Sequence, residues 1–179
     1  MKTISNPLNN SDSAKQFAIA LQDERVAHLV RLCARGFSRS LSRRLAVHNV
    51  SFGQWVFLRI LWSEEGLSQR QLSERANLTE PTVHTALSKM EQLGLIYRQH
   101  KEGNRRKRCV YLSERGHGLK KVLEPLAVEA NNIAMAGLDA SQQEAMHQML
   151  IHVLSNLELD EVKAEAWGQQ IPPTRGFAI

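Results

Sequence analysis

The chain has 179 residues, of which 42% are hydrophobic and 23% are charged, a composition typical of a folded globular protein rather than a disordered one. No apolar run is long enough to cross a bilayer, and the polar first 13 residues lack the apolar core of a signal peptide. We therefore expect a cytoplasmic protein with no membrane partner. The two cysteines, Cys33 and Cys109, exclude a disulfide framework and a zinc-ligand spacing, and we predict no cofactor and no metal.

The basic residues are distributed unevenly along the chain. The formal net charge is +5, and residues 67–112 hold nine Lys or Arg against four Glu, so the rest of the chain is balanced. A local basic excess is typical of a surface that binds a polyanion such as nucleic acid. A solvated charged face has the same composition, so charge alone does not decide between the two.

The first part of the chain is predicted to be helical. After a flexible polar arm, residues 1–13, an apolar stripe predicts one long helix over residues 14–47, with Arg44 and five other arginines on its opposite face. A short helix is expected over residues 52–62. The stripe of the long helix consists of Val26, Leu29, Val30, Cys33, Phe37, Leu41 and Leu45, and the inward residues of the short helix are Phe52, Trp55, Val56 and Ile60.

Two helices with clear start signals follow. Ser68 and Gln71 have the spacing of a capping box, in which each side chain bonds the backbone N–H of the other, and that helix is expected to end at Ala76. Thr79 is the predicted N-cap of the next helix, which runs to residue 93 and stops at Gly94. Two short helices joined by a tight turn form the helix-turn-helix pattern.

A β-hairpin is predicted next, with strands over residues 95–99 and 107–112 and a polar turn over residues 100–106. Ser113 caps a further helix, which Pro125 is expected to kink or divide. Ser141 and Glu144 form another predicted capping box. It opens a helix with a stripe of Met146, Met149, Leu150, Val153, Leu154 and Leu157. The predicted fold is mostly α with a small β-hairpin wing: a winged helix-turn-helix plus a helical region.

The helix over residues 80–93 has the two faces that a DNA-reading helix needs. Val83, Leu87 and Met90 form an apolar inner face. The outer face carries side chains that can bond phosphates or base edges in the major groove. These are Thr82, His84, Thr85, Ser88 and Lys89. A solvated surface helix is the plainer alternative, and the capped helix before it and the basic hairpin after it favour DNA.

Six of the eleven residues from 98 to 108 are basic, so the hairpin is the sharper signal. A guanidinium at a hairpin tip fits a narrow minor groove, and Arg105 and Arg106 are the tip candidates. Lys101, Lys107 and Arg108 are expected to neutralise phosphates. The segment has no aromatic platform for single-stranded RNA and is not an amphipathic basic helix for a membrane, which favours duplex DNA.

Three runs of the sequence carry a family resemblance: LSQRQLSERA (residues 67–76), TVHTALSKMEQLGLI (residues 82–96) and NRRKRCVYLSERG (residues 104–116). Together they resemble the MarR family of transcription regulators, and the last is similar to the family's Asp-x-Arg wing motif and Leu-Thr/Ser-x-x-Gly helix start. The wing aspartate of the family is Asn104 here. The bond that holds Arg106 would therefore be neutral rather than charge-assisted.

The resemblance implies a homodimer whose helices over residues 14–47 and 114–167 interlock, a winged helix-turn-helix domain over residues 48–113, and a C-terminal tail over residues 168–179. Two recognition helices about one DNA turn apart imply a pseudo-palindromic operator. The implied function is a transcription regulator, most commonly a repressor. The predicted DNA-binding residues are Ser68, Thr79, Thr82, His84, Thr85, Ser88, Lys89, Arg98, Lys101, Asn104, Arg105, Arg106 and Arg108.

The resemblance also implies a small aromatic or phenolic acid as effector, which binds beside the dimer helices and releases DNA. An arginine suits the carboxylate and apolar walls suit the ring, and an arginine-rich helix also suits the CoA thioester of such an acid. The candidates are Arg35, Ser38, Arg39, His48, Trp55, Arg59 and Trp62. Core packing of the tryptophans and solvation or dimer pairing of the arginines are the alternatives.

The sequence favours this function over three others. A thiol-based redox sensor of the same fold needs a reactive cysteine, but Cys33 is expected to be buried on the apolar stripe and Cys109 to be structural in a strand. A winged-helix adaptor that binds protein instead of DNA would not need the basic hairpin. An enzyme is disfavoured because the sequence has no glycine-rich phosphate loop, no metal-spaced set and no nucleophile motif.

Overall fold

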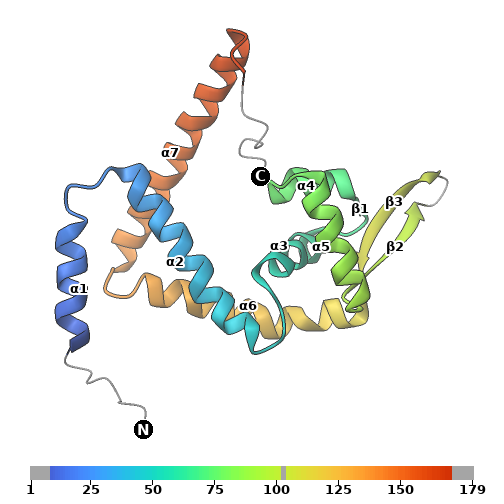
Figure 1. The fold of residues 1–179 in the computed structure, drawn as a ribbon, viewed down its shortest axis with the longest axis horizontal. Helices are drawn as coiled ribbons and strands as arrows, with labels where there is room; N and C mark the ends of the chain where they lie inside the picture. Colours follow the sequence, from blue (N-terminus) through green and yellow to red (C-terminus); the bar gives the residue numbers. More distant parts are fainter. Residues whose placement is uncertain (1–8, 102–103, 171–179) are drawn as a thin grey trace. The chain divides into compact units, whose positions relative to one another are not determined.

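The computed structural model describes residues 9–101 and 104–170, and the chain divides into two compact units, residues 1–40 and 41–179 (Figure 1). The described residues form seven helices and three short strands. The helices are α1 (Asn9–Ala20), α2 (Val26–Ala46), α3 (Phe52–Ser63), α4 (Gln69–Ala76), α5 (Glu80–Gln92), α6 (Glu114–Ala134) and α7 (Ala140–Ala166). The strands are β1 (Leu67–Ser68), β2 (Ile96–Lys101) and β3 (Asn104–Leu112). The predicted class, mostly α with a small β-hairpin wing, is confirmed, and a third strand extends the hairpin to a small antiparallel sheet.

The long helix predicted over residues 14–47 is in fact two helices. α1 begins at Asn9, inside the segment predicted as an arm, and α2 begins only at Val26. Between them, the amides of residues 21, 22 and 24 bond carbonyls three residues back, at 3.2 Å each, so the backbone tightens and leaves the α-helical path. The single-helix prediction was wrong because the apolar stripe starts only at Val26, and no helical periodicity connects it to the residues before it.

The last turns of α2 belong to the second unit. Leu41 and Leu45 are buried in its core. Arg44, predicted to lie on the face opposite the apolar stripe, has a side chain that is only 17% exposed, and its Nη2 donates to Glu129 Oε1 of α6 at 3.0 Å. A carboxylate of α6 thus lies against this end of α2, a contact that helical periodicity does not reveal.

α3 lies in the middle of the hydrophobic core of the second unit. Of its residues predicted to face inward, only Trp55 is buried, whereas Phe57, Leu58 and Leu61 are at most 1% exposed. α3 is in contact with α4, α5, α6 and β3, so it needs apolar side chains on most of its circumference. A prediction that allowed only one buried face therefore missed the more deeply buried residues.

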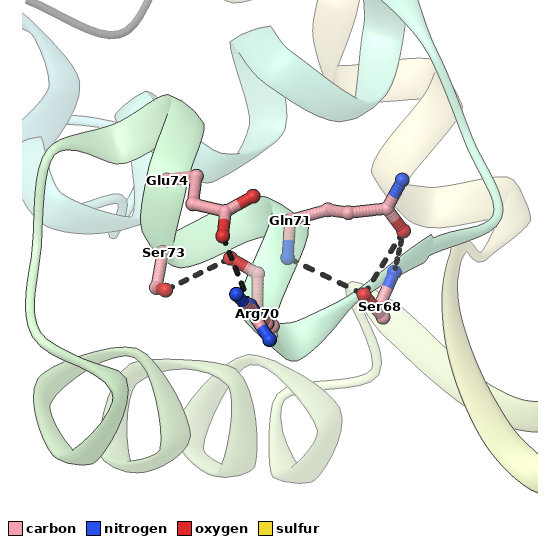
Figure 2. Close-up of polar contacts among 5 residues, drawn as sticks. All are labelled: Ser68, Arg70, Gln71, Ser73 and Glu74. Carbon is pink, nitrogen blue, oxygen red and sulfur yellow. Dashed lines mark hydrogen bonds and ion pairs between the residues drawn. The ribbon is translucent and has the colours of Figure 1, made fainter.

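The helix-turn-helix forms as predicted. α4 starts with the Ser68–Gln71 capping box, in which Gln71 N donates to Ser68 Oγ at 3.3 Å and Ser68 N donates to Gln71 Oε1 at 3.0 Å (Figure 2). After α4, Asn77 takes a left-handed backbone with φ of 52°, which turns the chain toward α5. Thr79 has the extended backbone of an N-cap, and Gly94 closes α5 with φ of 66°.

The hairpin is longer than predicted and belongs to a three-stranded sheet. β2 and β3 pair antiparallel from Ile96 with Leu112 to Lys101 with Asn104, and β1 pairs with the other edge of β3. The predicted turn over residues 100–106 was too long, because Lys101 lies in β2 and Asn104 to Arg106 lie in β3. Residues 102 and 103, between the strands, lie outside the described residues. β1 pairs only with Cys109 and Val110, so the basic part of β3 pairs on one side only, where charged residues are common, and their presence did not mark a turn.

α6 starts as predicted, with Gly116 N donating to Ser113 Oγ at 3.1 Å. Pro125 lies inside α6, which continues through it, so the helix is not divided. A proline removes one backbone donor. Leu123 and Ala130, on either side of it, are buried in the core, and this packing holds the helix where the hydrogen bond is lost.

α7 begins with a capping box other than the predicted one. Gln142 N donates to Asp139 Oδ1 and Asp139 N donates to Gln142 Oε1, both at 2.9 Å. The prediction of Ser141 and Glu144 was wrong because two capping pairs overlap here, and Asp139 with Gln142 forms the box two residues earlier. The carboxylate of Asp139 is the stronger acceptor and suits the positive end of the helix dipole.

The predicted apolar stripe of α7 is exposed within the chain. No residue of α7 is buried, and five stripe residues are between 40% and 63% exposed. They are Met149, Leu150, Val153, Leu154 and Leu157. A contiguous exposed apolar surface of this kind marks an interaction site. None of the helices in the described ranges has the length and apolar character needed to span a membrane.

Candidate nucleic-acid interface

The recognition helix α5 has one buried and one exposed face. Val83, Leu87 and Met90 are completely buried, which holds the helix on the core as predicted. The outer face carries Thr82, His84, Thr85 and Lys89, all exposed, and Ser88, which is half-buried. The inner contacts thus fix the rotation of α5 about its axis, and this rotation presents the polar residues of its N-terminal half to solvent.

Two hydroxyl contacts orient the threonines at the start of α5. Thr79 Oγ1 lies 2.9 Å from Thr82 Oγ1, and Thr79 makes no side-chain capping bond to the backbone. Thr85 Oγ1 donates to Pro81 O at 3.1 Å, so its hydroxyl proton is occupied while its oxygen can still accept a bond. These contacts restrict the rotamers of the three threonines and present their acceptor atoms and methyl groups on an exposed surface.

His84 does not stand alone on this surface. Its Nδ1 lies 3.2 Å from Oε1 of Gln69, the first residue of α4. An amide oxygen only accepts, so Nδ1 donates in this arrangement and Nε2 is left to contact a ligand. Gln69 was not among the predicted site residues. Its position beside the Ser68 cap, at the N-terminus of the helix that precedes α5, is the signal that identifies it.

Ser68, predicted to contact DNA, is engaged in the cap of α4. Its Oγ accepts from Gln71 N and lies 2.9 Å from Gln71 Oε1, to which it donates (Figure 2). Arg70, a further residue that the sequence reasoning missed, has a side chain that is 76% exposed, and its Nε lies 3.1 Å from Glu74 Oε1. The exposed cation at the start of α4 is therefore Arg70, and Ser68 shapes the backbone that carries it.

Arg98 of β2 is turned toward α5. Its side chain is only 11% exposed, Nη2 donates to Ser88 Oγ at 3.0 Å, and Nε lies 3.5 Å from Glu91 Oε2. Two of the predicted DNA-binding residues, Arg98 and Ser88, are thus brought together with each other. Glu91 was not among the predicted site residues, although its position three residues after Ser88 puts it on the same helix face.

The wing carries its basic residues on two paired strands. Arg105 and Arg106, predicted to lie at the tip, are in β3, and the residues between the strands are outside the described part. The side chain of Arg108 is exposed, and Arg108 pairs with His100 in the register of the hairpin. The backbone therefore places a series of cations along β3 rather than in a loop.

The candidate ligand residues of the second unit have different environments. Trp55 is buried, and its ring meets that of Trp62 edge to face, with centroids 5.5 Å apart. Trp62 Nε1 donates to Gly116 O at 2.9 Å. His48 is half-buried and Arg59 is exposed. The two tryptophans thus pack against each other, and Trp55 serves the core.

The other three candidates lie together in the first unit. Arg35, Ser38 and Arg39 line an open groove of about 710 Å³, which also includes Phe17 of α1 and Arg31 of α2. A groove with several guanidinium groups and an aromatic ring has the chemistry to hold an organic anion. The described parts of the chain hold no cluster of His, Cys, Asp or Glu able to bind a metal ion.

The two cysteines differ in accessibility. Cys109 is buried in β3, as predicted for a structural residue. Cys33 is exposed, and the prediction that it would be buried on the apolar stripe was wrong. The stripe residues Val26 and Val30 near it are 66% and 42% exposed, so this part of α2 is not covered by its own chain.

The sequence model of the MarR family matches residues 50–107. The HTH-type transcriptional regulator TtmR of Methylorubrum extorquens is 27% identical over 150 residues, which cover 84% of this chain and 73% of TtmR. The HTH-type transcriptional repressor Rv2887 of Mycobacterium tuberculosis is 30% identical over 110 residues, which cover 62% of this chain and 79% of Rv2887. The chain belongs to the MarR family.

Solved structures agree with this assignment. The MarR-family protein Rv2887 in complex with DNA has a TM-score of 0.62 at 25% identity, covering 73% of this chain and 98% of that structure. Rv2887 in complex with p-aminosalicylic acid has a TM-score of 0.61 at 26% identity, covering 72% and 98%. The predicted winged-helix fold is confirmed. MarR-family proteins are DNA-binding transcription regulators and not enzymes, as predicted for this chain.

Proposed function

We propose that this MarR-family regulator is a homodimeric repressor that binds a pseudo-palindromic duplex operator and releases it on binding a small aromatic acid or its CoA thioester. The observation that supports operator reading is the geometry of α5. Its inner face is completely buried while Thr82, His84 and Thr85 are exposed. A helix held rigidly by its apolar face presents these side chains in one arrangement, as the reading of base edges requires.

The DNA contacts divide by chemistry. Residues that can bond base edges in the major groove are Thr82, His84 and Thr85, supported by Gln69. Residues proposed to meet the phosphates or the minor groove are Thr79, Ser88, Lys89, Lys101, Asn104, Arg105, Arg106 and Arg108. Ser68 is proposed to act through the cap of α4, which positions this end of the helix. Phosphate contacts supply affinity that depends on salt, whereas base contacts supply sequence preference.

The DNA-binding proposal is tested by titrating a labelled mixed-sequence duplex of about 30 base pairs, long enough for two half-sites. The measurement is fluorescence anisotropy at several salt concentrations between about 50 and 200 mM. We expect the logarithm of the association constant to fall linearly with the logarithm of the salt concentration, by roughly 0.9 for each phosphate contact. Binding that is absent, or that does not respond to salt, contradicts the proposal and favours the protein-binding adaptor.

The dimer is supported by apolar surface that the chain does not cover. The stripe of α7 and the residues Val26 and Val30 of α2 are exposed. These are the two segments whose stripes suggested an interlocked dimer. Leaving such apolar surfaces in water is unfavourable, and a second copy of the chain would bury them.

The effector class is supported by one relative and by local chemistry. Rv2887 has been crystallised with p-aminosalicylic acid, a phenolic acid. In this chain, Arg35 and Arg39 line the groove of the first unit, while Trp62 is half-buried and Arg59 exposed in the second. A thermal-shift titration with p-aminosalicylic acid and its CoA thioester tests the proposal. We expect a rise in the unfolding midpoint and weaker duplex binding, because the ligand stabilises the native state that it prefers.

Redox sensing is the second candidate, because Cys33 is exposed in this chain. Mild hydrogen peroxide would then weaken duplex binding by the unaltered protein and leave the Cys33→Ser variant unaffected. If peroxide has no effect on the unaltered protein, or an equal effect on both, Cys33 is not a sensor.

A further inference from the structure

Arg98 connects the two parts of the protein that are proposed to touch DNA. It lies in β2, one strand of the wing, and the wing strand β2 lies beside α5 (Figure 1). Its guanidinium donates to Ser88 Oγ at 3.0 Å, and Nε forms an ion pair with Glu91 Oε2 at 3.5 Å. Both partners belong to α5 and lie three residues apart, on one face of the helix.

The exposure of Arg98 does not fit a phosphate contact. Its side chain is 11% exposed, whereas Arg70 of α4 is 76% exposed. A guanidinium is removed from water at a high cost unless its donors find partners. In Arg98, Nη2 bonds Ser88 Oγ, whereas the buried Nε makes no hydrogen bond and meets Glu91 Oε2 only as an ion pair at 3.5 Å. The planar fork of the guanidinium can bond two groups in a fixed geometry, which a lysine ammonium cannot do.

Besides joining β2 to α5, the contact neutralises Glu91. This carboxylate lies in the last turn of α5, where the helix dipole is negative, on the face of the protein that is proposed to bind DNA. Both effects disfavour an unpaired negative charge at this position. The guanidinium of Arg98 neutralises that charge and at the same time ties the helix to the wing.

We propose that Arg98 is a positioning residue that fixes the wing relative to the recognition helix through Ser88 and Glu91, and that it does not itself contact DNA. The proposal rests on the proposed DNA-binding function. Recognition helix and wing then approach the major groove and the backbone as one rigid body. Loss of Arg98 lets the wing shift relative to the recognition helix, so it reduces sequence discrimination more than the general affinity for DNA.

The experiment compares Arg98→Gln, Arg98→Lys and Glu91→Gln with a matched control, Arg108→Gln, which removes an exposed arginine from the other strand of the same hairpin. Each protein is titrated with a duplex selected by the unaltered protein from a randomised library, and with a shuffled duplex of the same composition. We expect Arg98→Gln to lose about tenfold or more in affinity for the selected duplex, the size of one lost base discrimination. Its salt dependence on the shuffled duplex stays that of the unaltered protein.

The other variants separate positioning from phosphate binding. Arg98→Lys keeps the charge and is expected to fail to restore discrimination, and Glu91→Gln is expected to reproduce part of the loss. Arg108→Gln is expected to reduce the salt slope by about 0.9 on both duplexes. If Arg98→Gln reduces the salt slope in the same way, or if Arg98→Lys restores binding fully, Arg98 is a phosphate contact and the proposal is overturned.

A measurement without DNA keeps this test distinct from that of the proposed function. The thermal midpoints of Arg98→Gln, Glu91→Gln and the double variant form a double-mutant cycle. We expect the double variant to lower the midpoint no more than Arg98→Gln alone, because both changes remove the same contact. Additive losses overturn the proposal. If the cycle shows coupling but the unaltered protein does not bind duplex DNA, the proposed function is wrong, while the structural contact between Arg98 and Glu91 is still supported.

Discussion

Gly116 lies where the first turn of α6 meets the end of the recognition helix. A Cβ added at this position would lie 2.2 Å from Leu95 O and 3.0 Å from Leu112 Cδ2. The carbonyls at the end of α5 find partners on the same turn: Ser113 Oγ donates to Gly94 O at 2.6 Å, and Arg115 Nη1 donates to Leu93 O at 2.7 Å. These carbonyls have no partner within α5, so the start of α6 serves as its cap.

Gly116→Ala is expected to destabilise the protein, because the added methyl group meets backbone that cannot move aside easily. A loss of about 1–3 kcal/mol is typical of overpacking, and it lowers the thermal midpoint by roughly 2–4 °C per kcal/mol in a chain of this size. Gly118→Ala is the control, since a Cβ there meets nothing within 4 Å. Alanine is the better helix former, so the control should be neutral or stabilising. Equal midpoints for the two variants would show that the close approach at Gly116 has no energetic importance.

His84→Ala is expected to change which sequences are bound more than how tightly DNA is bound in general. The side chain is exposed and contacts Gln69, so stability should change by no more than about 0.5 kcal/mol. Selection from a randomised duplex library is the measurement, with Gln69→Ala as a companion that should alter the same base positions. A uniform loss of affinity across all sequences would make His84 a phosphate contact instead.

At the scale of elements, start signals predicted most boundaries correctly where one cap residue stood alone. Ser68 and Ser113 cap α4 and α6 as expected. The prediction failed at α7, where Asp139 and Ser141 compete, and at the wing, where basic residues proved to be in strands. Local hydrogen bonds decide a helix start, whereas strand pairing depends on a partner strand that a single window of sequence does not show.

Arg106→Ala is expected to weaken duplex binding without unfolding the protein, because Arg106 belongs to the basic series of strand β3. Loss of one phosphate or minor-groove contact should reduce the salt slope by about 0.9, with a change in stability within about 0.5 kcal/mol. Lys121→Ala, which removes an exposed charge from α6, is the control and should bind DNA as the unaltered protein does. Unchanged affinity of Arg106→Ala would rule out the role of Arg106 in the wing.

At the scale of the whole molecule, the apolar surface of α7 is the feature that still needs a partner to bury it. Leu154 is 45% exposed and Leu157 is 47% exposed, although their spacing is that of a core-facing stripe. The sequence pattern predicted that these residues would be covered. The structure of one chain shows that their own chain does not cover them.

Leu154→Asp is therefore expected to separate the proposed dimer into monomers while the monomer keeps its helices. A charge placed inside an apolar interface is costly, and binding of two half-sites is lost along with the dimer. Sedimentation velocity at micromolar concentration and circular dichroism are the measurements, with Asn156→Asp at an exposed polar position as the control. A variant that sediments as the unaltered protein does would place the dimer contact elsewhere.

The sequence by itself determined the fold class, the helix-turn-helix and the inner face of α5, because capping residues and helical periodicity act over a few neighbouring residues. Only the tertiary structure decided that Arg98 faces Ser88 and Glu91, that Arg44 pairs with Glu129, and that Gly116 lies against Leu95 O. Each of these contacts joins separate elements, and which side chains meet there depends on how those elements pack. Burial then separates the arginines: Arg44 and Arg98 are little exposed and join two elements each, whereas an exposed arginine is free to meet a phosphate as proposed.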